Sequence, residues 1–244
     1  MLLRPLLPAA LALAGLVTAA PLRAAPSLQA LEQALNSSST DALTAVLEPG
    51  AGLDPEQVAR RQLLLREQFP DASWSVQPGQ PLKDGRPTTQ IRVTGHREEG
   101  PYHFRFEAQQ QLVLGSSGNR FNSQEVIRES SVLRSGDSDL KVSLLIPDAV
   151  LTGQRYDLDV VFDEPLDGAV VAGAVKPVTA GELLRLQTPD LQLEALGGGG
   201  IFKSVQAPYQ PGTQTWAVLL VHPKGIVAAS KRVRVVADRS ALSF

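Results

Sequence analysis

The sequence predicts a mixed fold, with an α+β first half and an all-β second half folded as an antiparallel sandwich. Apolar residues recur every three or four positions between residues 28 and 69, which is typical of helices, and every two positions from Trp74 onward, which is typical of strands. Beyond residue 137, about seven short apolar runs alternate with turn residues, and helical spacing is absent, as expected of a β-sandwich.

Residues 1–25 predict a signal peptide. Arg4 precedes an apolar stretch of roughly a dozen residues, and the small residues that follow allow cleavage after Ala19 or nearer Ala24. The stretch is shorter than the about 20 apolar residues of a membrane span. We therefore expect an exported protein, in the periplasm, the cell exterior or a thylakoid-type lumen. The alternative is a membrane tether formed by an uncleaved N-terminal segment.

Composition excludes several classes of function. The chain has no cysteine, which rules out disulfides, thiolate metal sites and cysteine nucleophiles. Without Arg4 and Arg23 of the leader, 21 basic residues face 25 acidic ones. This near balance gives no support for a nucleic-acid or anionic-membrane partner, which would require a basic stripe. No membrane span is expected after signal cleavage.

Three helices are expected at the start of the mature chain. Apolar spacing places the first over 28–35 and the second over 41–47. The third has the strongest start signal, because Asp54 can act as the N-cap and Pro55 suits the first helical position. Pro70 ends it.

Two alternating runs, 89–96 and 102–114, predict a β-hairpin with Glu99-Gly100 as its two-residue turn. In that register Val93 lies opposite Phe106, so that apolar residues meet on one face and polar residues on the other. The residues predicted to face inward are Ile91, Val93, Gly95, Phe104, Phe106, Ala108, Gln110, Leu112 and Leu114. A further strand is expected within 121–134.

The short polar segment 135–139 predicts a domain boundary. The domains then cover 26–137 and 138–238, and 239–244 form a tail. Strands of the second domain are predicted at 140–146, 156–162, 169–175, 183–196, 201–206, 215–222 and 227–236.

Residues 28–136 resemble the nuclear transport factor 2-like (cystatin-like) α+β cone family. The resemblance rests on the helix start Asp54-Pro55-Glu56-Gln57, its exit Phe69-Pro70-Asp71, Trp74 and the hairpin 91–114. The second half resembles an immunoglobulin-like domain through 156–160 and 211–216, although it lacks the Cys…Trp…Cys core of antibody domains. The resemblance implies N-terminal helices packed on a curved antiparallel sheet, followed by an immunoglobulin-like β-sandwich.

The cone family includes isomerases, dehydratases and cyclases, which place Asp, His or Tyr on the concave face beneath the helices. The resemblance implies a pocket at that place here, lined by Trp74, Ile91, Val93, Phe104, Phe106 and Gln110. Gln110 is the one polar residue of this set, and an amide cannot act as a general acid or base. We expect the helices to fill this interior; the alternative is an apolar ligand.

Glu125 and Glu129 are the weak catalytic candidates. If Ile127 and Leu133 face inward, both glutamates do so too, and burial would raise the pKa of each carboxyl enough for it to act as a base. The opposite register leaves both glutamates in water. The sequence pattern of 122–134 does not decide between the two registers.

No metal site or cofactor is expected. His96 and His103 are opposed in the predicted hairpin, but two imidazoles make an incomplete site. Asp163, Glu164 and Asp167 form an acidic stretch without the spacing of a calcium loop. No helix is predicted after Gly197–Gly200, which therefore indicates a hairpin tip and not a phosphate loop.

Together these features predict an exported, non-enzymatic binding or assembly protein, with a protein partner or self-association. The alternative is a small-molecule-binding protein or an isomerase/dehydratase-like enzyme that acts on an apolar ligand through Glu125 or Glu129.

Overall fold

The computed structural model describes residues 26–136, 140–179, 181–182 and 189–242, and within them the protein is mostly β. Three helices come first: α1 (Leu28–Asn36), α2 (Thr40–Val46) and α3 (Pro55–Gln68). The strands are β1 (Ser73–Pro78), β2 (Thr89–Glu99), β3 (Tyr102–Ser117), β4 (Arg120–Ser135), β5 (Val142–Leu145), β6 (Ala149–Leu151), β7 (Arg155–Phe162), β8 (Ala172–Val178), β9 (Glu194–Ala195), β10 (Gly200–Gln206), β11 (Gly212–His222) and β12 (Gly225–Val236), followed by the 3-10 helix η1 (Arg239–Leu242).

The helices begin where the sequence predicts. The side chain of Ser27 caps α1 by accepting a hydrogen bond from the Ala30 N–H. The Asp54 carboxylate caps α3 by accepting from the N–H groups of Glu56 and Gln57. These oxygens satisfy amide groups that the helix itself leaves without partners. Among the described residues, no helix combines the length and the apolar character needed to cross a membrane.

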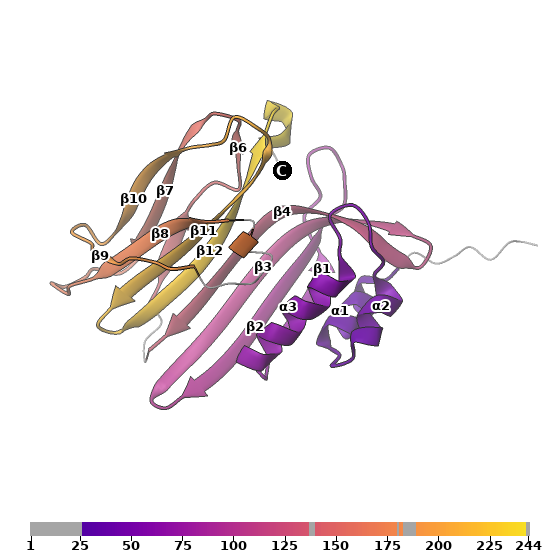
Figure 1. Cartoon of the computed structure of the whole chain (residues 1–244), viewed down its shortest axis with the longest axis horizontal. Helices are drawn as coiled ribbons and strands as arrows, with labels where there is room; N and C mark the ends of the chain where they lie inside the picture. Colours follow the sequence, from indigo (N-terminus) through magenta and orange to yellow (C-terminus); the bar gives the residue numbers. More distant parts are fainter. Residues whose placement is uncertain (1–25, 137–139, 180, 183–188, 243–244) are drawn as a thin grey trace, which may run out of the picture.

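One large sheet runs through both halves of the chain. Its strand order is β1-β2-β3-β4-β12-β11-β8-β9, all antiparallel, and β6 adds a parallel pairing to β12 (Figure 1). A second, three-stranded sheet has the order β10-β7-β5. The two halves meet through β4 and β12, where Ser131 pairs with Ser230.

The predicted fold class is therefore wrong. The chain is not an α+β unit of helices on a curved sheet followed by an immunoglobulin-like sandwich, because nine strands of both halves form one sheet and the helices are few and short. The pairing of β4 with β12 joins segments separated by most of the second half, and a local sequence pattern carries no information about such a pairing.

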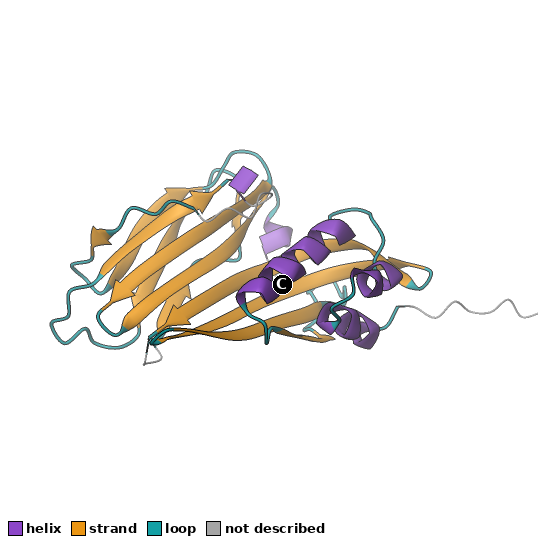
Figure 2. Cartoon of the chain, turned by 60° about the horizontal axis from the view of Figure 1, so that its bottom comes forward, coloured by secondary structure: helices purple, strands orange, loops and turns teal. Residues whose placement is uncertain are grey.

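Each half has its own apolar core, and the two cores lie on opposite faces of the large sheet. In the first half the helices cover one face, as Figure 2 shows. In the second half the three-stranded sheet supplies the other layer of the core. Two consecutive residues of β4 show the change of face, because Leu133 packs into the helix-covered core and Val132 packs into the second core. We call the face of β1–β4 opposite the helices the open face.

The hairpin of β2 and β3 has the predicted faces but a different register. Gly95 lies opposite Phe106, and Val93 lies opposite Ala108, two residues from the predicted pairing. The turn is Gly100-Pro101, not Glu99-Gly100, and Gly100 adopts a φ of 59°, which glycine reaches without strain. A shift of two residues keeps every side chain on its predicted face.

Two strand predictions in the second half are also wrong. The sequence pattern did not indicate β6, which pairs with the end of β12. The predicted strand 183–196 is reduced to β9, and its residues 183–188 lie outside the described part, as does the predicted signal peptide 1–25. The predicted tail contributes η1.

Candidate functional site

Five of the six residues predicted to line a pocket beneath the helices are packed into the first core, and the sixth, Gln110, is among the residues of the groove described below. Trp74 and Ile91 are 7% and 8% exposed, and the rings of Phe69 and Phe106 stack with centroids 5.3 Å apart. A Cβ atom added to Gly95 would lie 2.8 Å from the Cβ of Phe69, so the α3 exit rests directly on the strand backbone. Val93 and Phe104 pack against the same core, which is thus filled by side chains of the helices and of the α3 exit.

Glu125 and Glu129 do not face the same side of the sheet. Glu129 shares the helix-covered face with Leu133, and it accepts a hydrogen bond from the Gln110 amide at 2.6 Å and pairs with Arg232 at 3.5 Å. A bulge at Ile127 reverses the alternation, so that Glu125 lies on the open face. The structure therefore matches neither of the two registers considered, which kept both glutamates on one face, and each carboxylate is held by at least one arginine.

The two histidines that the predicted register opposed are not opposed in the structure. His96 lies opposite Arg105, and its Nδ1 is 3.0 Å from the Asp71 carboxylate, whereas the His103 Nδ1 is 3.3 Å from Glu98. The hydrogen bond from the His96 N–H lowers the pKa of Asp71.

The acidic stretch of Asp163, Glu164 and Asp167 lies exposed in the turn after β7. Within the described ranges, no three His, Asp or Glu side chains are placed to hold a metal ion.

A polar groove of about 550 Å³ lies on the open face, where the first half meets the second. Its lining residues are Gln80, Pro81, Lys83, Gln90, Gln109, Gln110, Gln111, Arg128, Ser130, Asp148 and Lys231. The loop between β1 and β2, residues 79–88, supplies one side of the groove. The segment that leads into β6 supplies the other side.

Two neighbouring rows of paired residues form the floor of the groove. In one row Gln90 lies opposite Gln111, which lies opposite Arg128. In the next row Gln109 lies opposite Ser130, which lies opposite Lys231 of the second half. Because paired residues of a sheet point to the same side, these side chains form a continuous polar surface across four strands.

The amides of the floor are held by specific contacts. The Gln111 Nε2 donates to the Thr88 Oγ1 at 3.0 Å and to the Gln80 carbonyl at 3.1 Å, which ties β3 to the 79–88 loop. The Gln109 Nε2 lies 3.4 Å from the Ser130 Oγ. Glutamine side chains offer both donors and acceptors, so this floor can bind groups of either kind.

The groove carries a net positive charge on a chain whose formal net charge is −2. Lys83, Arg128 and Lys231 are basic, and Asp148 is the single acid of the lining, so the lining has a net charge of +2. The Asp148 carboxylate pairs with the Arg128 Nε at 2.9 Å and with the Lys231 ammonium, which is 14% exposed. This acid therefore holds two cations in place between the two halves.

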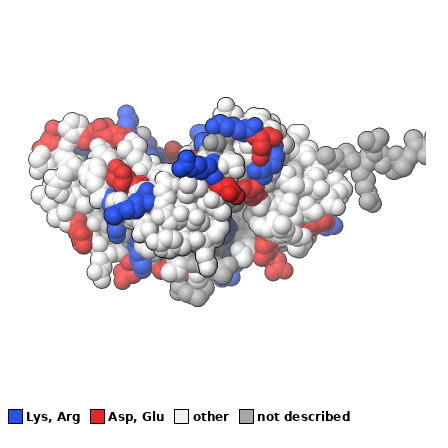
Figure 3. Space-filling view, turned by 90° about the horizontal axis from the view of Figure 1, so that it is seen from above, with Lys and Arg blue, Asp and Glu red and all other residues white. Residues whose placement is uncertain are grey.

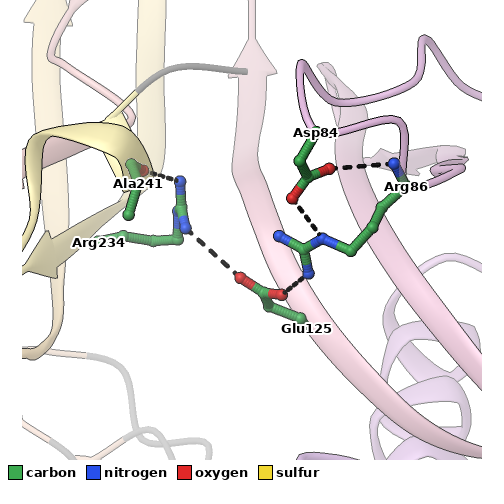
Figure 4. A network of polar contacts seen from close by, with 5 residues as sticks. All are labelled: Asp84, Arg86, Glu125, Arg234 and Ala241. Carbon is green, nitrogen blue, oxygen red and sulfur yellow. Dashed lines mark hydrogen bonds and ion pairs between the residues drawn. The ribbon is translucent and has the colours of Figure 1, made fainter.

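A network of ion pairs fixes the 79–88 loop beside the groove (Figure 4). The Arg86 guanidinium pairs with Asp84 at 2.7 Å and with Glu125 at 2.6 Å, and Glu125 also pairs with Arg234 of β12 at 3.5 Å. Arg234 in turn donates to the Ala241 carbonyl at 3.0 Å. The loop is thus linked to η1 through one carboxylate.

Pairing shifts the pKa values of Asp84 and Arg86, whereas burial shifts that of Arg234. The hydrogen bond from the Arg86 N–H lowers the pKa of Asp84, and the hydrogen bond to Glu125 raises the pKa of Arg86. Burial lowers the pKa of Arg234, although Glu125 opposes this effect. Viewed from above, the molecule presents basic and acidic side chains next to one another near its middle (Figure 3).

The sequence contained one signal for this groove that the predictions did not use. Gln109-Gln110-Gln111 is a run of amides in the middle of an alternating strand, where apolar side chains are expected on one face. The contributions of Asp148 and Lys231 had no such signal, because they reach the groove only through the pairing of β12 with β4.

Comparison with known protein families finds a match for part of the chain. Residues 137–236, which are less than half of the chain, match a family described as a domain of unknown function (DUF8623). No curated protein matches the chain. The matched region contributes Asp148 and Lys231 to the groove, and the remaining lining residues lie outside it.

Proposed function

We propose that the protein is an exported, non-enzymatic binding protein that holds a polar ligand in the groove on its open face. The observation that carries this proposal is the groove itself, a hollow of about 550 Å³ lined almost entirely by amide, hydroxyl and charged side chains. This volume lies in the range of about 300 to 1,000 Å³ of small-molecule sites. The signal-peptide pattern of residues 1–25 supports the exported location.

The groups at the groove favour binding over catalysis. General acid–base chemistry needs a carboxylate or imidazole that can exchange a proton with a ligand. Asp148 is engaged by two cations, and Glu125 beside the groove is engaged by Arg86 and Arg234. Charges fixed in this way are suited to orienting a ligand.

The packing of the first core counts against the alternative, an apolar ligand or an isomerase/dehydratase-like enzyme. The apolar residues that would line its pocket are packed into the helix-covered core, and Glu129 is paired with Arg232.

The outer edge of the large sheet is unfavourable for self-association through β1. Asn36 of α1 binds both the N–H and the carbonyl of Trp74, at 2.9 and 2.7 Å, and Glu32 accepts from the Val76 N–H. These contacts occupy backbone groups that another strand would need.

The proposal can be tested by NMR on the full mature chain labelled with ¹⁵N. A neutral galactose trisaccharide, a galacturonate trisaccharide, a hexaglutamate peptide and laurate would each be titrated separately. We expect at least one polar probe to shift the side-chain NH₂ signals of Gln90 and Gln109 and to leave the Trp74 indole signal unchanged. A shift of the Trp74 signal with laurate, without any shift at the glutamines, would overturn the proposal in favour of an apolar ligand.

A further inference from the structure

We infer that the ligand of the groove is an anionic saccharide, a short chain of sugars that carry carboxylates. This inference rests on the proposed function and adds the chemical class of the ligand. It draws on the charge of the lining, on the arrangement of the floor amides and on the state of the strand backbones.

The charge of the lining residues favours an anionic ligand. The lining has three basic side chains against one carboxylate, although the chain as a whole is net negative. Arg128 lies on the floor and is 48% exposed on its side chain, and Lys83 lies on the exposed 79–88 loop on one side of the groove. A carboxylate placed between them can accept charge-assisted hydrogen bonds, which are shorter and stronger than neutral ones.

The amide side chains of the groove floor favour a ligand that carries hydroxyl groups. A sugar hydroxyl both donates and accepts hydrogen bonds, and so does the side chain of Gln90, Gln109 or Ser130. These groups stand at neighbouring positions of the two floor rows, so a chain of sugars lying across β2, β3 and β4 would meet a hydrogen-bonding side chain at each strand. Cross-strand neighbours lie about 5 Å apart, which is close to the length of one sugar ring.

The backbone around the groove argues against an acidic peptide. The groove lies over the middle of the sheet, where the backbone groups of β2, β3 and β4 are paired with one another. A peptide therefore cannot bind here by adding a strand, which is how extended peptides commonly bind sheets.

Calorimetric titration of the full mature chain tests the inference. The probes are the galacturonate trisaccharide, the galactose trisaccharide and hexaglutamate. We expect the galacturonate trisaccharide to bind, and Lys83→Gln and Arg128→Gln each to weaken it roughly tenfold, the effect of losing one hydrogen bond to a charged group. Lys224→Gln, which removes an exposed lysine in the turn between β11 and β12, is the matched control and should leave the affinity unchanged.

The outcomes separate this inference from the proposed function. Equal binding of the neutral and acidic trisaccharides would overturn the inference and leave the proposed function standing, and so would binding of hexaglutamate alone. Binding of none of the polar probes would overturn both. An unfolding midpoint measured for each variant shows whether a loss of affinity reflects a loss of fold. Should Arg128→Gln unfold, Gln109→Leu tests the same floor, with Gln33→Leu on the exposed side of α1 as its control.

Discussion

The two halves of this protein solve the same problem in different ways. Both must cover a face of one sheet, and the first half does so with three helices, whereas the second half uses a three-stranded sheet on the opposite face. Strand β4 contributes to both cores, because Leu133 packs into the first and Val132 packs into the second. Within two residues of β4, the packing layer thus changes from helices on one face of the sheet to strands on the opposite face.

This change of cover explains where the groove lies. The open face of β2–β4 is uncovered as far as Lys231. The second core begins at the next paired position on this face, where Val132 lies opposite Ala229. The second core therefore borders the uncovered part of the open face on one side, and the 79–88 loop borders it on the other side. The polar groove is the hollow between them, and it needs both halves of the chain.

The largest expected effect comes from the two cores. Leu43→Ala in the first core and Leu158→Ala in the second remove side chains with no exposed area, which should lower the free energy of unfolding by about 2 to 5 kcal/mol each. Trp74 and Trp216, the only tryptophans, each report on one core. Urea unfolding would be followed by fluorescence in Trp74→Phe and Trp216→Phe backgrounds.

Because β4 and β12 join the halves, each substitution should shift both tryptophan transitions together. Two transitions, of which only the one in the substituted half moves, would mean that the halves unfold independently and would weaken the comparison. The exposed residue Leu63 provides a control, since Leu63→Ala should change the free energy of unfolding little.

The stability of the first half should depend on the contacts that α1 makes with the edge strand β1. Asn36→Ala removes the side chain that binds both backbone groups of Trp74, and we expect a loss of about 1 to 2 kcal/mol of stability. The exposed edge should also promote dimers, detectable by analytical ultracentrifugation. Gln33→Ala on the same helix should remain monomeric, and dimers at equal levels in both variants would contradict this account.

The stability of the protein should show an alkaline step that originates in its second half. Burial raises the pKa of Tyr156 above its ordinary value of 10.0, while its hydroxyl accepts from the Trp216 Nε1 and donates to Gln214. The folded state then keeps the phenol proton to a higher pH than the unfolded state. The free energy of unfolding is therefore unaffected by this group below pH 10 and falls as the pH rises above it.

Tyr156→Phe should remove this fall and should cost about 1 kcal/mol at neutral pH through the lost hydrogen bonds. The measurement is urea unfolding between pH 8 and 11, followed by Trp216 fluorescence. Identical slopes above pH 10 for the two proteins would show that other groups cause the alkaline loss.

The smallest effect on stability is expected at the loop beside the groove. The side chains of Arg86 and Glu125 are 47% and 45% exposed, so Arg86→Ala should cost less than about 1 kcal/mol. Amide hydrogen exchange in 79–88 should nevertheless become faster, because Glu125 would no longer hold the loop. Unchanged exchange would mean that the contacts of Gln111 with Thr88 and Gln80 suffice to fix the loop.

The features that could be predicted from the sequence are local ones. The starts of α1 and α3 follow from the cap residues Ser27 and Asp54, although the prediction specified only the second. Alternation in β2 and β3 gave the right faces. It could not give the register, because a shift of two residues leaves the pattern unchanged and the turn chemistry fits Gly100-Pro101 as well as Glu99-Gly100.

The features that could not be predicted depend on pairing over long distances. The bulge at Ile127 changes the face of Glu125 without altering the composition of the strand. The boundary predicted at 135–139 lies at the end of β4, a strand that pairs with β12 of the second half, and residues 137–139 lie outside the described part. The groove could not be predicted for the same reason, since Gln109 and Lys231 become neighbours only through the pairing of β12 with β4.

The pairing of β4 with β12 is the central claim, and a disulfide can test it directly. The chain has no cysteine, and the Oγ atoms of Ser131 and Ser230 lie 2.7 Å apart, on opposed residues of the two strands. Opposed residues have Cα atoms about 4.5 to 5.5 Å apart, which suits a disulfide. Ser131→Cys/Ser230→Cys should form an intramolecular disulfide under mild oxidation, detectable as a linked peptide by mass spectrometry. Two free thiols in the folded variant, under conditions in which a denatured sample oxidises, would contradict the account.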